Sequence, residues 1–429
     1  MDKRPPALVS AARIRDGIED GQVPRLRRRL QWVLFAISAL GSTGYLAAIT
    51  AGTLAAAEIA GGPAIGGVPT ASLTLGTALA ASVLSSFMLR AGRRPGIIIG
   101  LGIGFVGALV AVGAVLAGSI PLLLLGSALT GFANGASQLG RYVAADLATP
   151  ERRASAVGIV VWGATAGAVI GPNLIGPGGI VADAIGVPTL SGAYVLTALF
   201  IGAALVVVVT LLRPEPYALA DPSALAMRAD GAKEPSAMRL LGRPAVLVAL
   251  ITLVAGQVVM VLIMTMTPIH LTDHGHGLTT VGFVLSAHMF GMFALSPLSG
   301  RLTDRFGSPT VIVGGLGLLG VAALMAAVAP PNGGFVLTLA LFLLGYGWNL
   351  GFVAGSALLT HGLPLGERTR VQGIADGLIW TSAAVASVSS GIVVASISYT
   401  ALGMMGIALL VGPLVLLLTS RPKLDLPSG

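Results

Sequence analysis

The sequence predicts an all-α membrane protein with 12 transmembrane helices arranged as two six-helix repeats. Of its 429 residues 55% are hydrophobic and only 10% are charged, whereas soluble domains carry about 25% charged residues. The mean hydropathy is +0.91. Twelve apolar runs have membrane length, and residues of the first half recur in the second at a fixed offset. These observations place the chain in a bilayer.

The twelve runs each reach about 18 residues or more, enough for an α-helix to cross a hydrocarbon core of ~30 Å. They lie near residues 31–56, 71–89, 96–117, 119–143, 154–175, 190–212, 244–268, 279–300, 309–329, 334–359, 371–397 and 400–419. We therefore expect twelve spans joined by short connections.

The basic residues predict the orientation. All 25 Lys and Arg fall on the side of the two termini: in the N-terminal arm, after each even-numbered span and in the tail. By the positive-inside rule this side is cytoplasmic. We expect a multi-pass protein of the cell (inner) membrane with both termini in the cytoplasm. No cleavable signal peptide is expected, because residues 1–30 are polar and the following run is too long. The net charge of +8 is thus a topology signal, and no nucleic-acid partner is expected.

The predicted domains follow from the repeat. Asn134 and Asn349 are separated by the same interval as Gly158 and Gly373. Residues 213–243 are rich in charged residues and prolines, which is typical of a linker. We predict an N-terminal arm at 1–30, six-helix halves at 31–212 and 244–420, a cytoplasmic linker at 213–243 and a tail at 421–429.

The chain has no cysteine, which excludes disulfides, thiolate metal sites and iron–sulfur clusters. Any metal must bind Met, His or carboxylate side chains. Neither a catalytic constellation nor a nucleotide-binding loop is visible in the sequence. We therefore expect a carrier driven by gradients, not an enzyme, and we expect no cofactor.

A gating loop follows the eighth span: Gly300, Asp304, Arg305 and Gly307 form the pattern G-x-x-x-D-R-x-G. The copy after the second span has Ser85 and Leu89 in place of Gly and Asp. In a duplicated six-plus-six chain this pattern resembles the major facilitator superfamily over residues 30–420. The resemblance implies the major facilitator fold, alternating access, and loops that help to switch between inward-open and outward-open states. Whether the first loop functions is left open.

Soft donors cluster in spans 7 and 8. Met260 and Met264 share one helix face, and His288 and Met292 repeat the spacing of four on the next span. Five of the twelve methionines lie in the stretch from Met260 to Met292. Thioether and imidazole favour Cu(I) over cations that prefer oxygen. The alternative is packing, because Met often fills membrane cores, but an ionisable His inside a span is functional by default.

The paired motifs, one on each of two consecutive spans, resemble those of the CcoA-type bacterial copper importers, which supply copper for cytochrome oxidase assembly. We expect an inner-membrane secondary transporter that imports copper, as Cu(I), through this site, with copper as substrate. One alternative is a small organic solute such as riboflavin, which relatives of those importers are thought to carry. Another is drug/proton efflux, because Gly163, Gly167, Gly171 and Pro172 resemble an antiporter motif. Against efflux, Ser127 stands where those antiporters usually carry Arg. A membrane receptor without transport is a further alternative.

Two further groups have open roles. His270, His274 and His276 lie between spans 7 and 8, either as an outer metal capture site or as solvated loop residues. Asp376, near the start of span 11, is either a proton-coupling site or the partner of Arg370 or of the loop arginines. The direction of transport, the coupling ion and the oligomeric state, a monomer included, stay open.

Overall fold

All regular elements are helical in the computed structural model, within the described residues 6–60, 65, 67–220, 237–276, 278–330 and 334–424. Twelve helical stretches are long and apolar enough to cross a membrane, which confirms the predicted spans. The first six are formed by α2 (Val23–Ala60), α3 (Val68–Ala91), α4 (Arg93–Leu116), α5 (Ile120–Leu147), α6 (Arg153–Ile170) and α8 (Thr189–Leu211). The last six are formed by α11 (Pro244–Asp273), α12 (Leu278–Phe293) with α13 (Ser296–Phe306), α14 (Ser308–Val328), α15 (Gly334–Leu358), α16 (Leu365–Ser396) and α17 (Tyr399–Leu424).

Shorter helices lie between the spans. They are α1 (Pro6–Asp16), α7 (Ile175–Ile185), α10 (Ala237–Leu241) and the 3₁₀ turns η1 (Asp20–Gln22), η3 (Pro150–Arg152), η4 (Gly171–Leu174) and η5 (Pro216–Leu219). α7 was not predicted. η5 lies in the predicted linker but is buried. Residues 221–236 of that linker lie outside the described residues.

Single glycines make the turns after spans 2 and 8. Gly92 has a φ of 107° and Gly307 a φ of 81°, values that disfavour residues with a Cβ. Each glycine alone separates two helices, α3 from α4 and α13 from α14. The two turns stand at equivalent positions of the two copies, so the sequence repeat is also a repeat of backbone geometry.

The chain divides into two compact units, and two helices begin in one and continue in the other. Unit 1 comprises Met1–Thr149, Gly163–Lys233 and Pro364–Trp380, and unit 2 comprises Pro150–Trp162, Glu234–Leu363 and Thr381–Gly429. Thus α6 begins in unit 2 and α16 begins in unit 1. The predicted halves, 31–212 and 244–420, stay a prediction about the sequence repeat.

Unit 1 is packed through small residues. A Cβ on Gly76 of α3 would lie 2.0 Å from the carbonyl oxygen of Ala128 on α5, and one on Gly131 would lie 2.2 Å from that of Leu73. Such close helix contact is typical of membrane bundles. The stripe of Gly163, Gly167 and η4 Gly171 likewise packs against α2 backbone or side chains. This packing accounts for the stripe without an efflux function.

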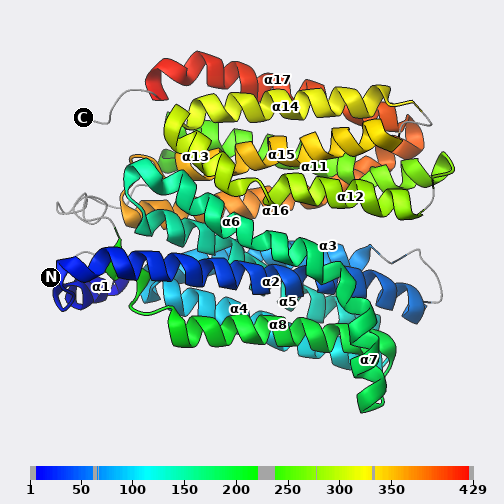
Figure 1. Cartoon of the computed structure of the whole chain (residues 1–429), viewed down its shortest axis with the longest axis horizontal. Coiled ribbons are helices and arrows are strands. Elements are labelled where there is room, and N and C mark those ends of the chain that lie inside the picture. The colour runs from blue at the N-terminus through cyan, green and yellow to red at the C-terminus, as the bar shows by residue number, and fades with distance from the viewer. Residues whose placement is uncertain are drawn as a thin grey trace. The chain divides into compact units, whose positions relative to one another are not determined.

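Unit 2 is built around α15, which packs against α11, α12 and α14 (Figure 1). Gly291 on α12 and Gly345 on α15 allow the closest approach, because a Cβ on either would lie 2.3 Å from a backbone oxygen of the other helix. α15 therefore packs on both spans that carry the predicted metal ligands.

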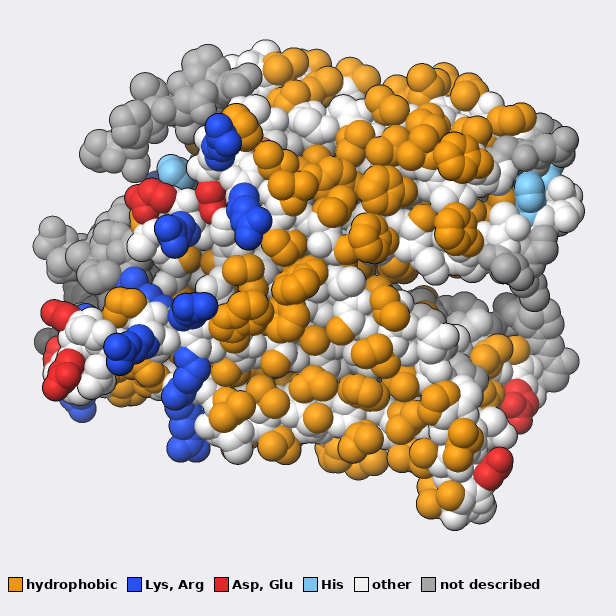
Figure 2. Space-filling view, in the orientation of Figure 1, with side chains coloured by type: hydrophobic (Ala, Val, Ile, Leu, Met, Phe, Trp, Pro, Cys, Tyr) orange, Lys and Arg blue, Asp and Glu red, His pale blue; other side chains and the backbone are white. Residues whose placement is uncertain are grey.

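The surface agrees with a membrane protein. In Figure 2 hydrophobic side chains cover the helix flanks of each unit, and in unit 1 the Lys and Arg side chains gather at the helix ends near α1. Exposed Arg25, Arg28 and Arg29 at the start of α2 belong to this end. The cytoplasmic assignment of that end stays a prediction.

Candidate functional site

His288 is the most enclosed of the predicted metal ligands. Its side chain is 0% exposed, and Nδ1 lies 2.8 Å from the carbonyl oxygen of Leu341 on α15. A carbonyl oxygen only accepts, so Nδ1 carries the proton and Nε2 keeps a lone pair. Nε2 has no hydrogen-bond partner within the described residues.

The three methionines differ in burial. Met260 is 3% exposed and Met292 is 7% exposed, whereas Met264 is half-buried. Met292 packs on α15, where a Cβ on Gly345 would lie 3.2 Å from its Cγ. His288 and Met292 are thus both directed toward α15. That all four side chains share one cavity stays a prediction.

The outer histidines are partly stacked. The rings of His270 and His274 are 4.3 Å apart, and His270 stacks at 4.1 Å on Tyr399 of α17. His276 lies beside Gly334, at the start of α15. Among the described residues no three His, Asp or Glu side chains are grouped to hold a metal ion. The outer capture site stays a prediction.

An aromatic cluster that the sequence analysis did not identify lies in the same helices. Trp348 of α15 stacks on Phe352, with ring centroids 4.4 Å apart, and meets Phe293 of α12 edge to face at 6.1 Å. Trp348 Nε1 donates a hydrogen bond of 2.9 Å to Oε1 of Gln257 on α11. We call Gln257, Phe293, Trp348 and Phe352 the aromatic–amide cluster. Its sequence signals were a Trp and a Phe one helical turn apart and a lone Gln in an apolar span.

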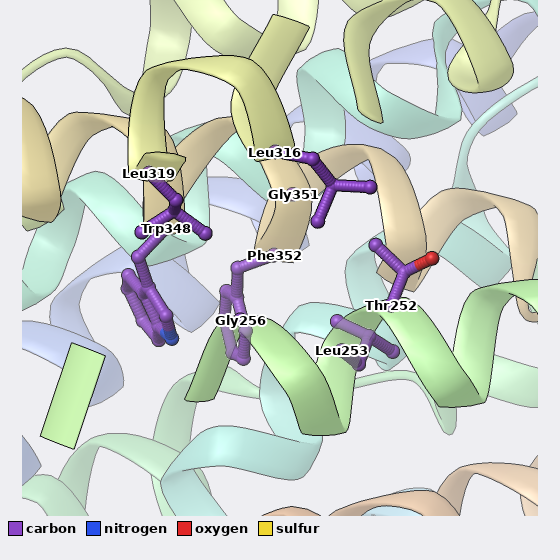
Figure 3. Close-up of a pocket in the computed structure, with 8 residues that line it drawn as sticks. All are labelled: Thr252, Leu253, Gly256, Leu316, Leu319, Trp348, Gly351 and Phe352. Carbon is purple, nitrogen blue, oxygen red and sulfur yellow. The ribbon is translucent and has the colours of Figure 1, made fainter. Parts of the chain in front are cut away.

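A small recess adjoins this cluster. Figure 3 shows its lining, which is largely apolar. The lining residues are Thr252, Leu253, Gly256, Leu316, Leu319, Trp348, Gly351 and Phe352. A Cβ added to Gly351 would meet nothing within 4 Å, so the missing side chain there helps to leave the space open.

Span 8 is interrupted between α12 and α13, and Asn349 of α15 forms hydrogen bonds with residues on both sides of the break. Its Nδ2 donates to the carbonyl oxygen of Met292 and to Ser296 Oγ, each at 2.6 Å, and its Oδ1 accepts from Ser299 Oγ at 2.5 Å. The equivalent Asn134 makes a longer contact of 3.4 Å with Thr77 Oγ1 of the unbroken α3. Span 8 was predicted as one run, and the periodicity of apolar residues gave no sign of the break.

The second gating loop holds the start of α6. The carboxylate of Asp304 accepts hydrogen bonds from the backbone N–H groups of Ala154, at 3.1 Å, and Ser155, at 3.0 Å. A Cβ on Gly300 would lie 2.6 Å from the Ala154 carbonyl oxygen, so this position needs glycine. The Arg305 guanidinium lies over the Phe306 ring at 5.3 Å. An aspartate at a helix N-terminus also complements the helix dipole.

The first loop has different contacts. Arg93 is buried, and its NH2 donates to Asp146 Oδ2 at 2.6 Å and to Gln372 Oε1 of α16 at 2.7 Å. Ser85 lies directly beside Gly373 of α16. The start of α16 is therefore held in unit 1 by an arginine of α4, where the second copy uses an aspartate.

Asp376 pairs with a residue other than those expected. Its Oδ1 accepts from Arg141 NH2 at 2.5 Å and from the Tyr142 hydroxyl at 3.0 Å, both on α5. The predicted pairing with Arg370 or the loop arginines was wrong, because the α16 face that carries Asp376 packs toward α5. A proton-coupling role for Asp376 stays a prediction.

Comparisons with known proteins agree with this architecture. The family model for the Major Facilitator Superfamily matches residues 32–279 and 248–429. An uncharacterized MFS-type transporter of Bacillus subtilis, YddS, is 36% identical over 402 residues, covering 91% of each chain. The riboflavin transporter RfnT of Brucella anthropi is 29% identical over 399 residues, covering 92% of this chain and 97% of its own.

A solved structure shares the fold. The human organic anion transporter MFSD10 (TETRAN) superposes with a TM-score of 0.72 at 18% identity, covering 91% of this chain and 99% of its own. None of these named relatives is described as a copper importer, so the resemblance to the CcoA-type importers is not confirmed. Sequence and fold together show that the chain belongs to the major facilitator superfamily.

Proposed function

We propose that this secondary transporter carries a small organic solute with a planar aromatic ring system, of the riboflavin type, and that the aromatic–amide cluster binds that ring. The observation that carries the proposal is the stack of Trp348 on Phe352 with Gln257 bonded to the indole. Ligand sites combine apolar and aromatic walls with a few placed polar groups. Aromatic pairs add about 0.5–1.5 kcal/mol beyond the burial of their area.

The carboxamide of Gln257 supplies the polar group. An indole N–H only donates, so the Gln257 oxygen takes this bond and the NH2 group is turned away from Trp348. Gln257 keeps a small exposed fraction of 4%. Its NH2 group is suited to donate to a ring carbonyl, while the aromatic rings contact the ring face.

The named relative adds separate support. RfnT, described as a riboflavin transporter, aligns with nearly the whole chain at 29% identity. An identity of 29% does not assign the solute by homology. Riboflavin is therefore the first solute to test.

Uptake of labelled riboflavin, by cells that cannot make it and lack their own importer, tests the proposal. Cells with the wild-type chain should accumulate the label. Gly351→Val, which fills the recess, should reduce uptake. Gly317→Val on α14 is the matched control, because a Cβ there also meets nothing within 4 Å. If the wild-type chain is present in the membrane at normal abundance but moves riboflavin neither into nor out of the cells, the flavin proposal is contradicted.

Copper import is the second candidate, and His288 favours it. Metal-binding imidazoles usually donate their other N–H to a carbonyl or carboxylate, as His288 donates to Leu341. Radiolabelled copper uptake with competitors tests it: silver should compete at comparable concentration, and excess manganese should not. Equal inhibition by manganese would exclude a thioether and imidazole site.

A further inference from the structure

The two crossing helices are held at their starts by unequal means. α6 begins in unit 2, where Asp304 of the gating loop accepts from its first N–H groups directly. α16 begins in unit 1, but the side chain of Leu89, which stands where the second copy has Asp304, has no oxygen with which to accept. The first loop is therefore joined to α16 by other contacts, one of which is the bond of Arg93 to Gln372 described above.

The residues after span 6 lie at this place. We call Arg213–Ala220 the strap. Glu215 Oε1 accepts from the N–H of Arg93 at 2.6 Å, and Oε2 accepts from that of Arg94 at 3.2 Å. A Cβ on Gly92 would lie 2.9 Å from the Glu215 carboxyl carbon, so the turn of the loop and the carboxylate fit each other. Burial raises the pKa of the Glu215 carboxyl, and these backbone N–H groups and Arg93 oppose the rise.

The same strap reaches α16. The Tyr217 hydroxyl lies 2.8 Å from Thr369 Oγ1, in the first turns of α16. The Arg93 guanidinium lies over the Tyr217 ring at 5.4 Å, and all residues of η5 are buried. Burial raises the pKa of Tyr217 to about 12, so its hydroxyl stays protonated and can either donate to the Thr369 hydroxyl or accept from it.

We infer that Glu215 and Tyr217 are positioning residues for the transport cycle. Through the strap, and beside the direct bond of Arg93 to Gln372, they strengthen in the first copy the link between gating loop and crossing helix that Asp304 makes in the second copy. The first loop is then functional, with its carboxylate supplied by the chain after span 6. The inference holds for any solute.

The absence of cysteine allows a test that needs no substrate. Ser85→Cys places one thiol beside Gly373, where it is buried while the start of α16 stays packed. A membrane-impermeant maleimide is added to inverted vesicles, and the labelling rate of this parent is compared with that of Glu215→Gln and Tyr217→Phe in the same background. Both changes preserve shape. We expect labelling to rise about tenfold, the factor that corresponds to ~1.4 kcal/mol.

Matched controls and a rescue sharpen the result. Glu19→Gln, at an exposed site, and Tyr194→Phe, in a buried cluster of unit 1 apart from the strap, should label like the parent. Leu89→Asp added to Glu215→Gln should lower the rate again, because it restores the missing aspartate. Unchanged labelling in both strap variants, or no rescue by Leu89→Asp, overturns the inference. If Glu215→Gln does not reach the membrane, Tyr217→Phe decides alone.

Discussion

Trp348 contacts every other member of the aromatic–amide cluster, so single substitutions there separate ring stacking from hydrogen bonding. The indole stacks on Phe352, meets Phe293 and donates to Gln257. Trp348→Phe keeps a ring and removes the N–H, which frees the Gln257 carboxamide to rotate. We expect riboflavin uptake to fall about tenfold, equivalent to ~1.4 kcal/mol, mainly through a higher KM. Trp32→Phe, at an exposed aromatic site, is the control. An unchanged KM in Trp348→Phe would assign the cluster to packing.

His288 is the residue that decides the copper candidate. Its unpartnered Nε2 and the thioether of Met292 lie one helical turn apart on α12. His288→Ala, Met260→Ala, Met264→Ala and Met292→Ala should each sharply reduce copper accumulation, because a site with few ligands tolerates no loss. Met325→Ala serves as control. Equal copper uptake in all variants would leave His288 as a packing residue.

At the scale of the elements, the interrupted span 8 is bonded across its break by one side chain of a neighbouring helix. Asn349 satisfies the carbonyl oxygen of Met292 and bonds two serines across the break. Asn349→Leu leaves the Met292 carbonyl oxygen without this donor, which costs about 1–3 kcal/mol for a buried group. The two serine hydroxyls keep bonds to the carbonyl oxygens of Phe293 and Leu295. We expect a clear drop in the thermal unfolding midpoint of the detergent-purified protein. Asn134→Leu, which removes one long contact, should lower it less. Equal losses would mean that the break has no special dependence on Asn349.

The second gating loop supports a prediction about rates. Asp304 accepts two backbone N–H groups at the start of α6. Asp304→Asn removes the charge and one acceptor, and so weakens a contact that favours one conformation. We expect solute binding to stay measurable while transport slows. Binding by equilibrium dialysis and uptake by filtration measure the two separately. If Asp304→Asn abolished solute binding but left the transport rate normal, the assignment of Asp304 to the conformational step would be contradicted.

At the scale of the whole molecule, α6 and α16 are two helices that contribute residues to both compact units. Each begins in one unit and continues in the other, and each start is held by polar contacts from a gating loop or its surroundings. Arg141 and Asp376 add a buried ion pair at the start of α16. Breaking such a pair by removing one partner typically costs about 3–5 kcal/mol, so these contacts fix α16 firmly in the described conformation.

Orientation in the membrane gives a prediction for the entire chain. Arg90 and Asp183 are exposed, and the predicted topology places them on opposite sides. Single cysteines at Arg90 and Asp183 should label differently in intact cells, because an impermeant maleimide reaches only the outer side. Asp183→Cys should label at once, and Arg90→Cys only after permeabilisation. The reverse pattern would invert the assignment of the cytoplasmic side.

The sequence by itself determined the helical class, the twelve spans and the internal repeat. Length and apolar composition decide whether a helix crosses a bilayer, and these are local properties of each run. Asn134 and Asn349 were correctly recognised as equivalents, and Gly92 and Gly307 turned out to share a turn geometry for the same reason. Asp304 and Gly300 were placed in a gating loop because that motif is local.

Only the tertiary structure decided which distant groups meet. In the aromatic–amide cluster Gln257 bonds to Trp348, which is 91 residues away in the sequence. Asp376 pairs with Arg141, which is 235 residues away. Such pairs depend on the rotation of each helix about its axis, which packing of small residues between helices sets and no local pattern specifies. The break in span 8 and the strap at Glu215 were hidden for the same reason: each depends on hydrogen bonds between a side chain and the backbone of a segment distant in the sequence.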